Sequence, residues 1–179
     1  MMNTFFYNND TLLYVKDNSR SERYGIQPGG ICIRFVFIMV NALKYRFTDH
    51  TADFGIQAFG KTLEQVFENA AFAISDLITD TNILEGTHSQ SISVGGDARD
   101  DLMVNWLREI LYLWHGMGML VKQTSVKEIT EFRLMADIIY DLYDKDKHEI
   151  RNEIKAITYH QLEVNRNVDG WFANFILDV

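Results

Sequence analysis

The stretch DHTADFGIQAFGKTLEQVFENAA (Asp49–Ala71) passes from a strand pattern to a helix pattern within a few residues. Apolar and other residues alternate over Asp53–Gly60, which is typical of a half-buried strand. Thr62 then precedes a run of apolar residues at helical spacing. Gln65 completes a capping box, in which the hydroxyl and the amide each satisfy a free backbone N–H. The stretch therefore predicts a strand followed directly by an amphipathic helix.

A second helix and further strands are predicted downstream. The helix lies in DLMVNWLREILYLWHG, with Asp97 or Asp100 as its N-cap and Gly116 or Gly118 at its end. His115, beside that end, is interpreted as a capping or surface histidine. Strand patterns cover Lys44–His50, Ser89–Asp97, Met119–Ile129, Glu131–Tyr143, Glu153–Val164 and Trp171–Val179, and Asp-Gly within Val168–Trp171 predicts a hairpin. Without strict alternation of strands and helices, the pattern predicts an α+β fold, a single domain of mixed β-sheet layers packed with two amphipathic helices.

The composition narrows the classes of protein to which this chain could belong. The chain has 179 residues, 47% hydrophobic and 23% charged, which suits one globular domain. With a net charge of −8, the chain lacks the excess of basic residues that is typical of a nucleic-acid binder. We therefore expect it to contact RNA only indirectly, and a protein or a metal is the favoured partner. The single cysteine, Cys32, allows no disulfide within the chain, which fits a reducing, cytoplasmic compartment. It is interpreted as inert.

The first forty residues differ from the rest. Residues 1–40 show no steady period, and the apolar run Ile31–Val40 is shorter than the roughly 20 residues of a spanning helix, so no membrane association is expected. We interpret 1–40 as an N-terminal extension that is non-native or disordered, with 41–179 as the domain. An extra strand or a floppy arm is the alternative, and Met39 is a candidate for the real start.

Known catalytic signatures are absent from the sequence. It has no Gly-rich phosphate loop and no Gly-x-Ser-x-Gly nucleophile elbow. One cysteine and five scattered histidines offer no pair of zinc ligands at tight spacing. Carboxylate oxygens therefore remain as the candidate functional groups.

Three carboxylates stand out. Asp178 shares a strand face with Ile176, so we expect it to be partly buried, and the terminal carboxylate of Val179 lies beside it. Asp53 is an acid that enters an apolar strand. Brought together, the three groups would repel one another unless a hard divalent cation such as Ca²⁺, Mg²⁺ or Mn²⁺ neutralised them. The alternative is that they are solvated acids at strand ends.

The chain resembles the archease family. The matching pieces are Asp49–Ala71, HEIRNEIKAITYHQLEV (His148–Val164) and the terminus FILDV (Phe175–Val179), in the same order and spacing over most of the chain from Leu43 onward. Family members usually begin shortly before the first motif, which is why Met39 is a candidate start. The resemblance implies a small α+β protein, and nothing functional is carried onto the residues before the match.

The resemblance also implies a function. Archeases are non-catalytic activators of the RNA-splicing ligase in tRNA splicing and RNA repair. They speed the transfer of GMP from GTP to the ligase histidine and so restore multiple turnover. They are also linked to chaperone-like action on a tRNA methyltransferase.

Specific residues follow from the same resemblance. The family's metal ligands map onto Asp53, Asp178 and Val179, with Ca²⁺ the expected cation and Mg²⁺ or Mn²⁺ as alternatives. A lysine important for activity maps onto Lys155, which would steady the carboxylates or meet a nucleotide phosphate, although a solvated lysine or a simple ion pair with Glu153 remains open. His50 and His160 would orient an aspartate ligand or be core histidines. Asp49 has no assigned role, and Tyr159 is interpreted as a packing residue.

Two rival functions remain open from sequence. One is a metal-dependent hydrolase that uses Asp53, Asp178, Lys155 and His160 with a metal-activated water. The other is a chaperone or adaptor for an RNA-modifying enzyme, which would need neither aspartate.

Overall fold

The structure is a computed structural model, and it describes residues 5–8, 11–14, 43–48 and 54–179. The chain divides into two units, Met1–Val40 and Asn41–Val179. In the first, β1 (Phe5–Asn8) and β2 (Thr11–Tyr14) form an antiparallel pair. Cys32 and Met39 lie outside the described residues. The interpretation of residues 1–40 as a non-native or disordered extension therefore stays a prediction.

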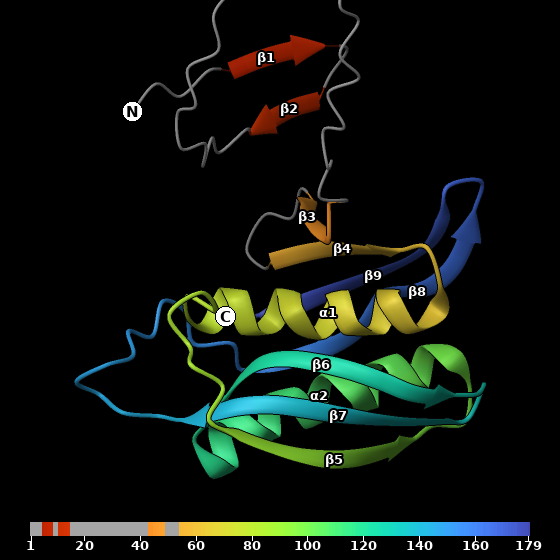
Figure 1. Cartoon of the computed structure of the whole chain (residues 1–179). Helices are drawn as coiled ribbons and strands as arrows, with labels where there is room; N and C mark the ends of the chain where they lie inside the picture. Colours follow the sequence, from red (N-terminus) through yellow and green to blue (C-terminus); the bar gives the residue numbers. More distant parts are fainter. Residues whose placement is uncertain (1–4, 9–10, 15–42, 49–53) are drawn as a thin grey trace, which may run out of the picture. The chain divides into compact units, whose positions relative to one another are not determined.

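In its described residues, the second unit has two helices and two antiparallel sheets (Figure 1), which confirms the α+β class. Strand order is β3-β4-β9-β8 in one sheet and β5-β7-β6 in the other. The elements are β3 (Tyr45–Thr48), β4 (Phe54–Gly60), α1 (Leu63–Ile78), β5 (His88–Gly95), α2 (Arg99–Met117), β6 (Met119–Ile129), β7 (Arg133–Leu142), β8 (Ala156–Asn167) and β9 (Gly170–Asp178). Among the described residues, no helix is long and apolar enough to cross a membrane.

The start of α1 agrees with the capping prediction. The Thr62 hydroxyl accepts a hydrogen bond from the backbone N–H of Gln65 at 3.3 Å. The Gln65 amide oxygen accepts from the backbone N–H of Lys61 at 2.8 Å, one residue earlier than in the standard box. The helix direction is therefore set by residues within one turn of its start, and the buried face of α1 turns toward the core.

The N-cap predicted for α2 is wrong. Ala98 occupies that position and makes no side-chain cap bond. The acids nearby bond elsewhere: Asp101 accepts from the backbone N–H of Asp97 at 2.8 Å, and Asp100 accepts from the backbone N–H of Val164 in β8 at 2.9 Å. A tertiary contact has thus taken the Asp100 carboxylate that local sequence assigned to the cap. The helix ends at Gly118, as predicted, in the left-handed conformation.

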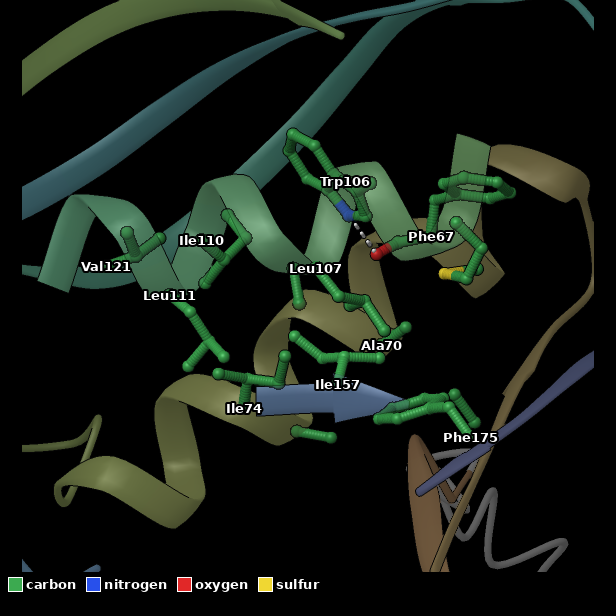
Figure 2. Packing of buried hydrophobic residues seen from close by; sticks show 14 of the residues in the cluster. Phe67, Ala70, Ile74, Trp106, Leu107, Ile110, Leu111, Val121, Ile157 and Phe175 are labelled. Carbon is green, nitrogen blue, oxygen red and sulfur yellow. Dashed lines mark hydrogen bonds between the residues drawn. The ribbon is translucent and has the colours of Figure 1, made fainter. Parts of the chain in front are cut away.

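Both helices pack into one hydrophobic core (Figure 2). Trp106 of α2 is fully buried, and its indole N–H donates to the carbonyl of Phe67 in α1 at 2.9 Å, so the buried polar atom is satisfied. Ile157 of β8 and Phe175 of β9 reach the same cluster. The core therefore ties the four-stranded sheet, whose strands β8 and β9 lead to the chain's end, to the two helices.

Strand β8 differs from its prediction. It begins at Ala156, later than the predicted Glu153, and extends to Asn167. Its pairing with β9 jumps from Thr158↔Ile176 to Glu163↔Asn174, so four residues oppose a single one. We call the segment 159–162 the β8 bulge. An irregularity of this kind interrupts the hydrogen-bond ladder locally and re-aims side chains at the edge of the sheet.

Candidate functional site

The pairing of β4 with β9 brings the two sequence motifs together. Phe54, the first residue of β4, is the Cα partner of Leu177, near the end of β9. Asp49, His50 and Asp53 lie outside the described residues. Asp53 is nevertheless bonded to Phe54, as Asp178 is bonded to Leu177. In the sequence, therefore, each of the two acids is next to one member of a directly paired couple.

The end of β9 is held by the segment before β8. The backbone N–H of Lys155 donates to the carbonyl of Asp178 at 2.8 Å. The Lys155 ammonium donates to the main-chain oxygen of Val179 at 2.9 Å. Sequence reasoning placed Lys155 inside a strand, whereas the strand starts one residue later. Within the described part of the chain, Lys155 forms no ion pair with Glu153 and has Val179 as its partner.

Asp178 is exposed, which corrects the expectation that it is partly buried. It pairs with Ala156, also exposed, so no side chain from that neighbour covers it. Ile176, on the same face, is buried with 5% of its surface exposed. The face of β9 thus changes from covered to open within two residues, and the Asp178 carboxylate is free to meet a ligand or partner from outside.

The donor set at this end fits a hard cation. Asp178 and Val179 offer only oxygen atoms, the ligands that Ca²⁺ and Mg²⁺ prefer. Among the described residues, no group of three or more His, Cys, Asp or Glu side chains is placed to hold a metal. A third carboxylate would come from Asp53, outside that part of the chain. The described residues therefore supply two adjacent oxygen donors and one neighbouring ammonium.

His160 and Tyr159 lie in the β8 bulge and are both exposed. The core-histidine alternative is therefore wrong for His160, whose backbone N–H donates to the Thr158 hydroxyl at 3.1 Å. Tyr159 is not a packing residue of the core. Its hydroxyl donates to Asp101 at 2.6 Å, and this hydrogen bond holds the pKa of Asp101 below its ordinary value. The bulge is thereby attached to the first turn of α2.

Sequence reasoning missed a row of polar side chains on the outer face of the four-stranded sheet. Neighbouring members are joined by hydrogen bonds of 2.9, 2.8 and 3.4 Å. We call this row the polar ladder; it comprises Arg46, Gln57, Asn174 and Glu163. Alternation within β4 and β9 is a signal for the face of each residue, but only the strand register shows that the four align.

Known proteins resemble this chain over the same region. A sequence model of the archease protein family matches residues 45–179. "Protein archease" of Methanosarcina barkeri is 37% identical over 140 residues, covering 76% of this chain and 96% of that protein. "Protein archease" of Pyrococcus abyssi is 34% identical, with 76% and 99% covered.

A solved structure is similar to this chain over the same region. The solution structure of protein 1598 of Methanobacterium thermoautotrophicum has a TM-score of 0.65 and 33% sequence identity to this chain, covering 76% of this chain and 99% of the other. The family match spans more than half of the chain and includes both ends of the β4–β9 pairing described above. The sequence and the fold agree, and this chain belongs to the archease family.

Proposed function

We propose that this protein is a non-catalytic activator of an RNA-splicing ligase in tRNA splicing and RNA repair. It would promote transfer of GMP from GTP to the ligase and allow multiple turnover. Family membership supports the general role. The observation that carries the proposal is the open end of β9, where exposed Asp178 and the Lys155–Val179 contact meet beside the strand that follows Asp53.

The proposed working part is a metal-binding tip formed by Asp53, Asp178 and Val179. A bound divalent cation, Ca²⁺ or alternatively Mg²⁺ or Mn²⁺, would supply positive charge that attracts phosphate or carboxylate oxygens. The chain's own groups hold the geometry. The backbone bond from Lys155 to Asp178 fixes the strand end, and the Lys155 ammonium orients the Val179 oxygen. His50 and His160 are proposed to assist from outside the ligand set.

This arrangement suits insertion into a partner. Asp178 is exposed and sits at the end of a strand that is held on both sides, by β4 and β8. A rigid strand presents its terminal groups with little entropy to lose on docking. We propose that the tip enters the active site of the ligase, where Lys155 meets a nucleotide phosphate and the carboxylates help to position the metal.

The test is transfer of labelled GMP from GTP to the ligase of the same organism, at limiting ligase, with and without this protein. We expect acceleration by the intact protein and loss of most of that acceleration with Asp178→Ala or Asp53→Ala. Asp178 is exposed, so its replacement should leave the fold intact. Asp146→Ala is the matched control, since it removes an exposed carboxylate in the loop before β8.

The same experiment separates the rival functions. If the intact protein leaves labelling unchanged, the ligase partnership is lost and the chaperone or adaptor for a tRNA methyltransferase becomes the leading proposal. If activation survives both aspartate substitutions, the metal tip is wrong while the partnership stands. Release of phosphate from GTP by the purified protein alone would favour the metal-dependent hydrolase.

A further inference from the structure

The polar ladder runs across all four strands of one sheet, from a cation to an anion. Arg46 donates from Nε to the Gln57 amide oxygen at 2.9 Å, and the Gln57 amide donates to Asn174 at 2.8 Å. Asn174 donates to the Glu163 carboxylate at 3.4 Å. The guanidinium thus lies at the β3 edge, the carboxylate at the β8 edge, and two amides lie between them.

A cleft of about 580 Å³ lies along this ladder. The β8 bulge lines it with Gln161 and Leu162, and Thr48 and Ile176 also line it. Gln161 has φ +55°, the one described residue other than glycine in the left-handed region. Such strain persists where the surroundings hold it, and it gathers at functional sites. The bulge is therefore held in an unfavourable backbone conformation at the wall of a polar cleft.

We propose that this cleft binds a guanine nucleotide, with the base at Glu163 and the phosphates toward Arg46. An ionised carboxylate only accepts hydrogen bonds. Guanine offers it two adjacent donors, the ring N1–H and the 2-amino group. Adenine offers one amino group beside a ring lone pair that would face the carboxylate. Both Glu163 oxygens accept in the structure, from Asn165 at 3.1 Å and from Asn174 at 3.4 Å, and each retains a further lone pair for one guanine donor. In this proposal Glu163 therefore selects guanine.

The spacing along the ladder follows the order of groups in a nucleotide. Neighbouring strands are about 4.8 Å apart, so three steps separate Glu163 from Arg46 by roughly 14 Å. Gln57 and Asn174 lie between, where their amides face the ribose hydroxyls. The guanidinium fork of Arg46 matches phosphate oxygens. Its Nε donates to Gln57 and its central carbon lies 5.6 Å from the centroid of the Phe59 ring, and the proposed phosphate contacts use its two terminal nitrogens. Leu162 supplies an apolar surface for the base.

The cleft shares a face with the exposed aspartate of the tip. Asn174, Ile176 and Asp178 alternate along β9, so they point to the same side of the sheet. Nucleotide binding would use neither Asp178 nor a partner enzyme. The inference therefore goes beyond the proposed function, and each can be wrong without the other.

The test is calorimetric titration of the full chain with GTP and with ATP, in buffer containing EDTA to remove divalent cations. We expect GTP to bind at least about tenfold more tightly than ATP, because ATP leaves the Glu163 carboxylate opposed by a lone pair. Glu163→Gln should remove that preference. Arg46→Met should weaken GTP and leave guanosine unchanged, since guanosine has no phosphate.

Glu131→Gln is the matched control, because it makes the same change at an exposed residue between β6 and β7. This variant should bind GTP and ATP with the same affinities as the unsubstituted protein. In the ¹⁵N-labelled protein, GTP should shift the side-chain amide signals of Gln57 and Asn174, which requires no variant. Equal affinity for GTP and ATP, no binding of GTP at millimolar concentration, or unmoved amide signals would each overturn the proposal.

Discussion

At the scale of single residues, Asp141 shows how one buried carboxylate organises a loop. Only 5% of its surface is exposed. It accepts hydrogen bonds from the backbone N–H groups of Glu85, Gly86 and Thr87 and from the Thr87 hydroxyl. Burial by itself raises the pKa of Asp141, but these hydrogen bonds favour the ionised form more strongly and hold the pKa well below its ordinary value.

Replacing Asp141 by Asn should therefore destabilise the fold by about 1–3 kcal/mol at neutral pH, since one acceptor oxygen becomes an NH2 group that faces backbone donors. The pKa is lower in the folded protein than in the unfolded chain. The contribution is thus complete above the unfolded pKa of about 4 and is lost as the pH falls toward the native pKa. Urea denaturation at pH 7 and pH 3 should show the difference between the two proteins shrinking. A difference that stays constant with pH would contradict the assignment, and Asp146→Asn should show no difference at either pH.

At the scale of elements, the end of α2 depends on Gly118. This residue has φ +63°, and its N–H bonds back to the helix carbonyls of Leu113 and Trp114. An added Cβ would meet only Tyr143, at 4.0 Å, so the space is open. The need for glycine here is conformational and not steric.

Gly118→Ala should accordingly destabilise the protein by about 1 kcal/mol, through the left-handed backbone alone. Gly118→Asn should recover part of the loss, because Asn tolerates this conformation better than Ala. The free energy of unfolding in urea measures both. If Ala and Asn have equal effects, the cost arises from contact with Tyr143 or from another cause.

At the scale of the whole molecule, the tip depends on where β9 ends. The main-chain oxygen of Val179 accepts from Lys155, and Asp178 stands exposed beside it. Adding residues after Val179 would convert its proposed terminal carboxylate into an amide carbonyl. We expect a two-residue extension to weaken Ca²⁺ binding in calorimetry by removing a formal charge from the site. An equal extension before Met1 is the control, and unchanged affinity in the first variant would remove Val179 from the ligand set.

Local signals succeeded where a few neighbouring residues decide the outcome. Thr62 and Gln65 start α1, Gly118 ends α2, and Asp169-Gly170 lies at the turn between β8 and β9. In each case the contacts that matter join residues within about one turn of each other. The same logic failed for the N-cap of α2, because Ala98 holds the cap position and Asp100 bonds to Val164 of β8, a partner far away in the chain.

The candidate site shows the same division between local and tertiary information. Its residue types, Asp178, Val179 and Lys155, were visible in the motifs of the sequence. The exposure of Asp178 and the hydrogen bond from Lys155 to Val179 were not, because they depend on how the start of β8 pairs with the end of β9. The polar ladder was invisible for a similar reason, since its members come from four strands.

The sequence by itself therefore determined the α+β class, the position of both helices and the family, because short-range periodicity, caps and motifs are written in neighbouring residues. Tertiary structure alone decided the strand order β3-β4-β9-β8, the β8 bulge and the neighbours of each carboxylate. Register between distant strands is set by how their side chains pack together in one core, and that free energy belongs to the assembled sheet and not to any one segment.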